Sequence, residues 1–252
     1  MVTTSDQRHA PLAFQKHQPT SRRRDRSRPL ITPSSPAHRL LLAAGLLGSV
    51  LFTASYMLDG ALRPGYDSLR QPISALSLGP GGWVQITSFM VFGALTCCSA
   101  IGWRATMSTG IGVTWYPRLK VLAGVALITA GIFSQDPSLG FPHGVASPAN
   151  PTLHAQIHNL ATLVSLTATI AGFLVLARRF VHEPKWHGWA AYAVLTAALM
   201  VILLAAFGSV NPGGPGGMFE KLATIAALLF NVALVSRLLS HDARVSFGKA
   251  SS

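Results

Sequence analysis

The sequence has 252 residues, of which 50% are hydrophobic and only 11% are charged. Soluble domains carry about 25% charged residues, so this composition excludes an ordinary soluble enzyme or binding domain and indicates a membrane protein. The formal net charge is +12, and its uneven distribution along the chain bears on orientation in the membrane.

Six apolar segments predict six membrane-spanning helices. Four of them contain no charged residue or histidine over 18 residues or more, enough to cross a hydrocarbon core of about 30 Å as a helix. These four are Leu40–Leu58, Trp83–Trp103, Leu160–Ala177 and Trp189–Val210. Two weaker segments, Leu119–Phe133 and Leu222–Leu239, carry Lys120 and Arg237 near their ends, where a long cationic side chain can reach the membrane surface. Because no segment alternates as a barrel strand does, we expect an all-α bundle of six transmembrane helices across residues 39–240.

The Lys and Arg residues indicate which side of the membrane each loop faces. With both termini in the cytoplasm, the inner segments hold 17 of the 20 Lys and Arg residues. This is the positive-inside pattern, so we expect a multi-pass protein of the cell (plasma) membrane. Residues 1–38 are basic and poor in apolar side chains, which predicts a disordered cytoplasmic tail. Residues 241–252 are expected to form a second, short cytoplasmic tail.

Membrane lipid is the partner that this charge distribution favours, since the basic run at residues 21–28 can touch anionic headgroups. Binding of nucleic acid through that run is the less favoured alternative, and we expect no nucleic-acid partner. We also expect no soluble nucleotide cofactor. The two Gly-Pro-Gly-Gly sequences, at residues 79–82 and 214–217, lack the Gly-Lys-Ser/Thr of a phosphate-binding loop.

A polar stretch from Tyr66 to Trp83 separates the first two spans and is expected at the outer surface. Pro72 suits the first turn of a short helix, with Ile73 and Leu76 on its apolar face. The first Gly-Pro-Gly-Gly then ends this interfacial helix, and Trp83 enters the membrane at the depth that indoles prefer.

Ionisable side chains gather on the outer side of this topology and form the candidate site. Such groups at the ends of membrane spans are costly unless they are paired or hydrated. The candidate catalytic residues are Asp67, Asp136 and His158, and the candidate binders of a lipid headgroup are Arg70, Gly81, Gly216 and Lys221. The glycines mark helix N-termini, whose free amides favour phosphate, and arginine binds phosphate in a bidentate way. Asp67 has two structural alternatives, an ion pair with Arg70 or a cap for backbone amides.

A divalent metal is a candidate cofactor on the same side. His154 and His158 are four residues apart, so they share one face of a helix. With Asp136 they would supply two imidazoles and a carboxylate, which suit zinc with an open coordination position. In the alternative, His158 hydrogen-bonds a loop carbonyl and Asp136 ends the third span.

Several short motifs resemble a known family of bacterial membrane proteins, catalogued as domain of unknown function 998. They are the run Tyr66–Ser74, the aromatic entry at Trp83, the pair Phe133 and Asp136, the helix start at His158 and Asn159, and Gly217–Lys221. The resemblance covers about residues 40–240. It implies a six-helix integral membrane protein and assigns no activity.

Two hypotheses of function follow from these observations. The first is a non-enzymatic sensor, scaffold or lipid- or partner-binding protein with a polar cluster on its outer face, favoured because no strong catalytic motif is present. The alternative is a lipid-modifying enzyme of the outer leaflet or a metal-dependent hydrolytic enzyme. Both expect Asp67, Arg70, Asp136 and His158 to converge in one hydrated pocket, since polar groups at the bilayer edge are stabilised by pairing.

The charge distribution generates a prediction of orientation. A reporter that is active only in the cytoplasm should be active when fused after Ser252 and silent when inserted near Ala146, because the loop that holds Ala146 is expected outside. Reporter activity in cells carrying each fusion measures this directly. Activity at both positions would contradict the assignment of the outer face.

Overall fold

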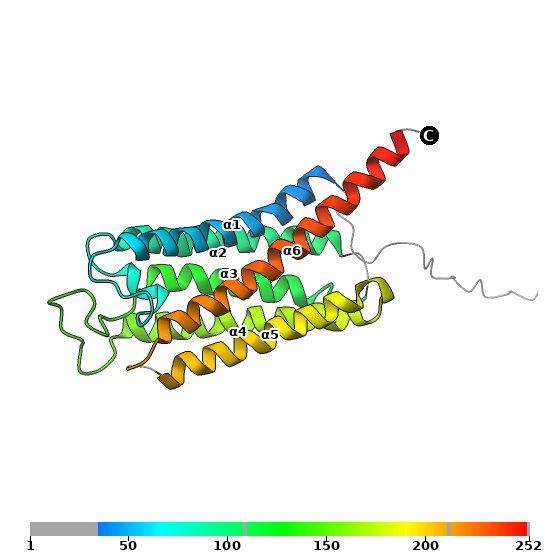
Figure 1. Ribbon diagram of the computed structural model, residues 1–252. Coiled ribbons are helices and arrows are strands. Elements are labelled where there is room, and N and C mark those ends of the chain that lie inside the picture. The colour runs from blue at the N-terminus through cyan, green and yellow to red at the C-terminus, as the bar shows by residue number, and fades with distance from the viewer. Residues whose placement is uncertain (1–34, 108–109, 211–212, 251–252) are drawn as a thin grey trace, which may run out of the picture.

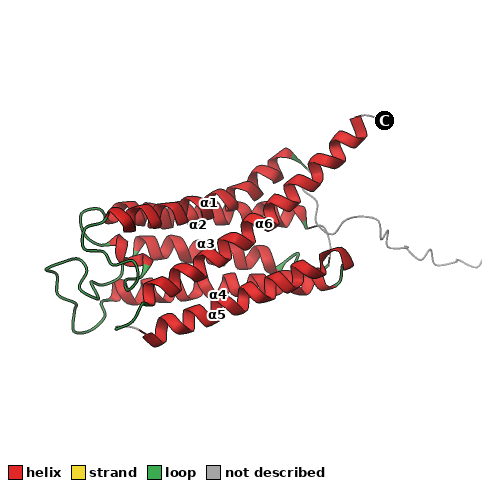
Figure 2. Cartoon of the chain, viewed as in Figure 1, coloured by secondary structure: helices red, strands yellow, loops and turns green. Residues whose placement is uncertain are grey.

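The computed structural model describes residues 35–107, 110–210 and 213–250. These residues form six α-helices and two short 3-10 helices, and they contain no strand (Figure 2). The bounds are α1 Pro36–Leu62, η1 Ile73–Ser77, α2 Gly82–Thr106, α3 Trp115–Ile132, α4 Leu153–Val181, η2 Pro184–Trp186, α5 His187–Val210 and α6 Gly216–Ala250. The all-α prediction is confirmed.

Five helices in the described part of the chain are long and apolar enough to cross a membrane. They are α1, α2, α4, α5 together with η2, and α6 up to Ser240. Large apolar side chains such as Leu47, Leu199 and Ile202 are exposed on their surfaces, as expected where a helix faces lipid. The chain is therefore an integral membrane protein. α3 is not clearly apolar, because Arg118 and Lys120 lie in the first two turns of its 18 residues.

The helices pack in chain order, and α6 closes the bundle. Each helix from α1 to α5 contacts the next one, as short connections between antiparallel helices favour. α6 crosses the bundle diagonally, from the loop end of α5 to the opposite end of α1 (Figure 1). The longer loops, at residues 63–81 and 133–152, lie together at one end of the bundle.

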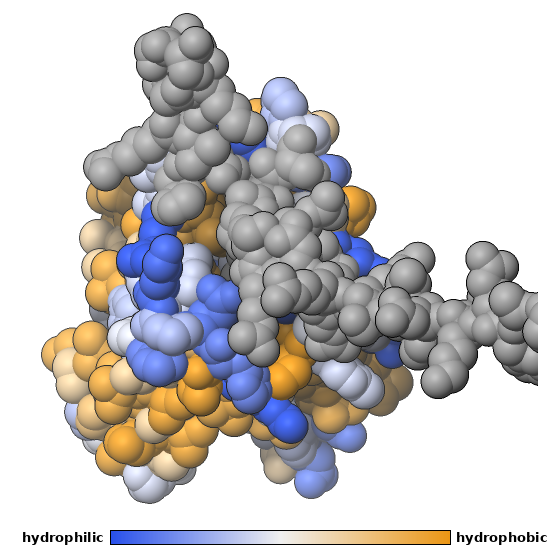
Figure 3. All heavy atoms as spheres, turned by 90° about the vertical axis from the view of Figure 1, so that its right-hand side faces the viewer, coloured by the Kyte–Doolittle hydropathy of each residue, from blue (hydrophilic) through white to orange (hydrophobic). Residues whose placement is uncertain are grey.

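The opposite end of the bundle carries the short connections and many of the basic residues. Arg104, Arg178 and Lys185 lie at the ends of helices or in connections here. Figure 3 looks onto this end and shows hydrophilic residues gathered between hydrophobic flanks. The guanidinium of Arg237 lies 4.7 Å from the ring centroid of Trp186. A cation–π contact of this kind holds α6 against the α4–α5 connection.

Two buried apolar clusters fill the bundle. The larger cluster joins residues of all six helices and includes Trp103, Tyr116 and Phe173. The smaller one lies beneath the long loops and includes Phe52 and Phe89. Neither cluster fills the whole interior, and a cavity remains between them.

The first and last helices extend beyond the predicted membrane domain of residues 39–240, although the apolar part of α6 ends at Ser240. Residues 1–34 lie outside the described residues, but Pro36 already begins α1, and the Ser35 hydroxyl accepts a hydrogen bond from His38 N–H. Serine at the N-cap followed by proline at the first helical position is a strong start signal. Hydropathy alone predicts the start of the membrane domain at residue 39, three residues after α1 begins. α6 likewise continues to Ala250, past the predicted start of the C-terminal tail at 241.

The predicted short helix after Pro72 exists, but it is buried within the bundle and does not lie on its surface. It is the 3-10 helix η1, and all five of its residues are buried. It folds inward and contacts α1, α2 and α6. The apolar face of Ile73 and Leu76 packs against Phe52, Tyr56 and Phe89, so the segment is part of the core and not a surface element.

The two Gly-Pro-Gly-Gly sequences begin helices α2 and α6, and both press against the segment that holds η1. A Cβ atom on Gly82 would collide with the carbonyl of Ser77, and one on Gly217 would collide with the carbonyl of Gln71. Only glycine lets the backbones approach this closely.

We predict that Gly217→Ala destabilises the protein by about 1–3 kcal/mol, the usual cost of overpacking. Gly208→Ala is the matched control, because a Cβ atom there meets no atom within 4 Å. Thermal unfolding in detergent measures both variants. Equal melting temperatures for the two would show that the contact with Gln71 is unimportant.

Candidate functional site

The guanidinium of Arg63 organises the loop that follows α1. It forms an ion pair with Asp59 at 2.8 Å and donates hydrogen bonds to the carbonyl oxygens of Leu76, Leu78 and Gly81. The side chains of Arg63 and Asp59 are only 11% and 13% exposed. One side chain therefore satisfies three carbonyls that the turn leaves without helical partners.

The first turn of α6 holds the preceding part of the same loop. The amides of Gly217 and Met218 donate to the carbonyls of Arg70 and Leu69. Glu220 Oε2 accepts a hydrogen bond from Ile73 N–H at 2.8 Å. These bonds join residues almost 150 positions apart, so the loop and α6 form one unit.

The predicted headgroup site on this turn is occupied by the chain itself. Lys221 is buried, and its Nζ donates to the carbonyls of Gln71 and Gly217. The N-terminus of α6 at Gly216 faces loop carbonyls, which take the place that a phosphate was predicted to fill. Gly81 is likewise covered, because the Arg63 guanidinium lies against it.

Asp67 caps the turn that contains Arg70. Its Oδ1 accepts hydrogen bonds from the amides of Leu69 at 2.9 Å and Arg70 at 3.4 Å. This is the capping alternative of the sequence analysis. Next to it the Tyr66 hydroxyl donates to the carbonyls of Gln71 and Pro72. Burial and then the charge of Glu220 raise the pKa of Tyr66 well above its usual value, so the hydroxyl stays protonated as a donor.

Asp136 and Thr152 hold the start of α4. Asp136 accepts hydrogen bonds from the amide and the hydroxyl of Thr152, at 2.8 and 2.7 Å. Thr152 in turn caps α4 by accepting from Ala155 N–H. Both oxygens of the Asp136 carboxylate are thus engaged in a structural role at the α3–α4 connection.

His158 hydrogen-bonds backbone carbonyls, as the structural alternative for this residue predicts. It is 1% exposed, and its Nδ1 lies 2.8 Å from the carbonyl oxygen of Ala130 and 2.7 Å from that of Phe133. His154 packs its ring on Phe133 instead. Among the described residues no group of three His, Cys, Asp or Glu side chains is placed to hold a metal ion. The predicted ligand set of His154, His158 and Asp136 is therefore not assembled in this structure.

No described bond joins the candidate residues of the predicted single site directly, although the Gln71 side chain accepts from Asp67 N–H and donates to the Leu139 carbonyl of the α3–α4 connection. The described bonds of Asp67 stay within the turn that leads to η1. Those of Asp136 and His158 stay at the connection between α3 and α4. These bonds stabilise loops and helix ends, and they do not join the residues into one pocket.

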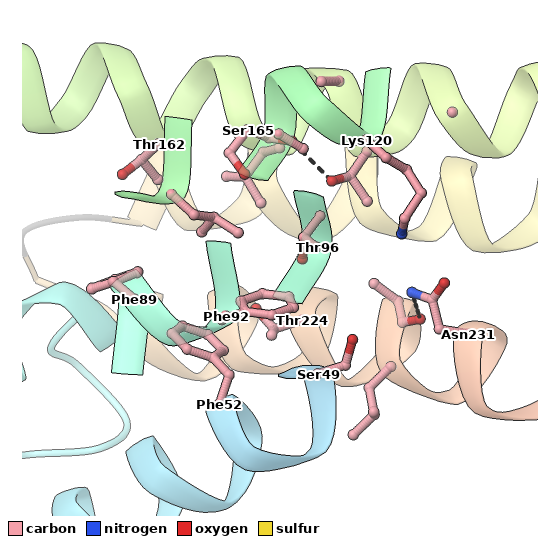
Figure 4. Close-up of a pocket in the computed structure, with 18 of the residues that line it drawn as sticks. Ser49, Phe52, Phe89, Phe92, Thr96, Lys120, Thr162, Ser165, Thr224 and Asn231 are labelled. Atoms are coloured by element: carbon pink, nitrogen blue, oxygen red, sulfur yellow. Dashed lines mark hydrogen bonds between the residues drawn. The ribbon is translucent and has the colours of Figure 1, made fainter. Parts of the chain in front are cut away.

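A cavity inside the bundle is the feature that sequence reasoning missed. Its volume is about 120 Å³, and residues of α1, α2, α3, α4, α6 and η1 line it. Figure 4 shows three phenylalanines, Phe52, Phe89 and Phe92, on one side of the space. Hydroxyl groups, including those of Thr96 and Ser165, supply part of the remaining wall. Glu220 and Lys120 also line it, so the wall includes two ionisable side chains.

Lys120 is directed into this cavity, contrary to the prediction that it reaches the membrane surface. In Figure 4 its ammonium group points across the space toward Asn231 of α6. Its Nζ also lies 5.8 Å from the ring centroid of Tyr116. The signal available in the sequence was a lysine inside an apolar segment, but its direction depends on how α3 packs against α2 and α4.

Comparison with known proteins gives one match. The family described as "Protein of unknown function (DUF998)" matches residues 46–237, so the resemblance predicted from short motifs is confirmed. No curated protein and no solved structure matches the chain. The matched range runs from within α1 to within α6 and includes the two long loops and the cavity.

We predict that Arg63→Lys destabilises the protein by about 1.5–3 kcal/mol, the scale of hydrogen bonds to charged groups. A single ammonium cannot reproduce the fork that holds Asp59 and three carbonyls together. Arg178→Lys, an exposed arginine of α4, is the control and should leave stability unchanged. Chemical or thermal unfolding measures both, and equal effects would remove the special role of Arg63.

Proposed function

This chain belongs to the DUF998 family, whose description assigns no activity, and we propose that it is a non-enzymatic membrane protein that binds a small amphiphilic ligand inside its helix bundle. The cavity between the two apolar clusters is the observation that carries this proposal. Binding of this kind serves a sensor or a carrier and needs no catalytic group.

The proposal includes a topology with six spans and cytoplasmic termini in the cell membrane. α3 is the sixth span. It packs against both α2 and α4, and its 18 residues rise about 27 Å, close to the thickness of the hydrocarbon core. The concentration of Lys and Arg near the termini and short connections supports this orientation.

The lining of the cavity supports binding of a ligand with both apolar and polar parts. Ligand pockets are mostly apolar, with a few polar groups that fix orientation. Phe52, Phe89 and Leu127 supply apolar surface here, while Thr53 and Ser165 supply hydroxyls.

The volume indicates the size of the ligand. An engineered protein cavity of about 150 Å³ binds benzene, so a cavity of about 120 Å³ suits a group near the size of one aromatic ring. Two acyl chains of a phospholipid would not fit. A small amphiphile is therefore favoured over a membrane lipid as the occupant of this space.

The structural roles of the outer polar residues favour binding in the interior over catalysis at the outer face. Asp67 and Asp136 cap backbone amides, and His158 is hydrogen-bonded to carbonyls. A general base needs a free position within reach of its substrate. These side chains direct their described bonds at the protein's own loops.

We predict that Thr169→Phe, which fills the cavity, lowers the affinity for benzamide at least tenfold. Benzamide is a neutral amphiphile of the right size, and Thr169 lines the cavity. Thr167→Phe is the matched control, since Thr167 is on the same helix but exposed. Thr169→Val keeps the volume and should keep the affinity.

Binding to the purified protein in detergent is measured by ligand-observed NMR and by the rise of the melting temperature with ligand concentration. The melting temperature without ligand shows that each variant is folded. Failure of the wild-type protein to bind benzamide, or unchanged binding in Thr169→Phe, would overturn the proposal.

A further inference from the structure

The cavity has different chemistry along its length. Figure 4 shows Lys120 and Asn231 at one end of the cavity, with Thr96 between this end and Phe92. Phe89 and Phe52 lie farther along, toward the long loops. A ligand in this space therefore meets a cation and polar groups at one end and aromatic rings at the other.

Lys120 has no acidic partner among the residues that the structure describes. The ion pair among these residues joins Asp59 to Arg63, and the Lys120 ammonium lies against the Tyr116 ring. An ammonium group inside a helix bundle is costly unless an anion or several dipoles stabilise it. A ligand that carries a negative charge would supply the missing partner.

Asn231 of α6 adds a second hydrogen-bond donor at the same end of the cavity, across from Lys120. Its Nδ2 donates one hydrogen bond to the carbonyl of Ala227 at 2.9 Å, and an amide NH₂ group has a second N–H to give. The ammonium from α3 and the amide from α6 face each other across the space. Two donors on opposite sides suit the two oxygens of one carboxylate.

The places of Glu220 and Lys120 indicate the direction in which such a ligand lies. Glu220 lines the cavity near η1, where its Oε2 accepts from Ile73 N–H. The Glu220 carboxyl is engaged with the η1 segment, whereas Lys120 lies in the second turn of α3, near the opposite end of the bundle. Phe52 and Phe89 favour an apolar group. The acid group of a ligand is thus directed to Lys120 and its apolar body to Phe52 and Phe89.

We infer that the ligand is a small monocarboxylic acid with one apolar body near the size of an aromatic ring, bound through its carboxylate to Lys120 and Asn231. This inference rests on the proposed function, because it concerns the same cavity, and it adds the class of ligand. A neutral molecule of the same shape fits the space but leaves the ammonium without its anion.

Benzoate and benzamide test the inference, since they have nearly the same shape and differ in charge. The wild-type protein should bind benzoate at least about tenfold more tightly than benzamide, the scale of hydrogen bonds between charged groups. Lys120→Met should lose this preference and bind benzoate no better than benzamide. Lys185→Met, at an exposed lysine of η2, should behave as the wild type.

A second variant keeps the test decisive if Lys120→Met does not fold. Asn231→Asp is nearly isosteric, and its carboxylate would pair with Lys120 and repel benzoate. It should abolish the preference for benzoate over benzamide. Affinities come from isothermal titration at neutral pH, where benzoic acid is ionised.

The outcomes separate the two proposals. If the wild type binds benzamide as tightly as benzoate, the carboxylate inference is overturned and binding in the cavity stands. An equal preference for benzoate in Lys120→Met and wild type also overturns it. If the wild type binds neither compound, the proposed function itself fails.

Discussion

The backbone of η1 is buried in the bundle without being α-helical, and the loop-bearing end of the bundle depends on the hydrogen-bond partners that this segment finds. An unpaired carbonyl or amide in a membrane costs several kcal/mol, and the segment of residues 69–82 that holds η1 is mostly not α-helical. Arg63 satisfies carbonyls at its second half, and the first turn of α6 pairs with its first half. η1 can then lie buried in the bundle and close the space beneath it.

The sequence predicted the helices well because their apolar residues occur in long uninterrupted blocks. The two glycine turns and the start of a helix after each were also predicted, since glycine and proline act locally. Helix ends were less accurate at Pro36 and Ala250, where hydropathy changes gradually. The family was recognised from short motifs that bear mainly on the outer loops.

The candidate site was predicted less well, for a physical reason. Sequence shows that Asp67, Asp136 and His158 lie at the ends of spans, but not which backbone groups they bond. The tertiary fold supplies local amides and carbonyls as partners, so each residue has a structural role. Lys120 is the converse case. In the sequence it lies at the end of a weak span, and only the packing of α3 turns its ammonium toward Asn231.

The bond between Glu220 and Ile73 also has a consequence for biogenesis. Its two residues are 147 positions apart, and a chain is synthesised from its N-terminus. The loop that follows α1 therefore emerges long before α6, which holds it, has been made. Until that last helix inserts, the amide of Ile73 and the carbonyls of Leu69 and Arg70 must be hydrated or bound elsewhere. Completion of the loop-bearing end of the bundle thus waits for the synthesis and insertion of α6.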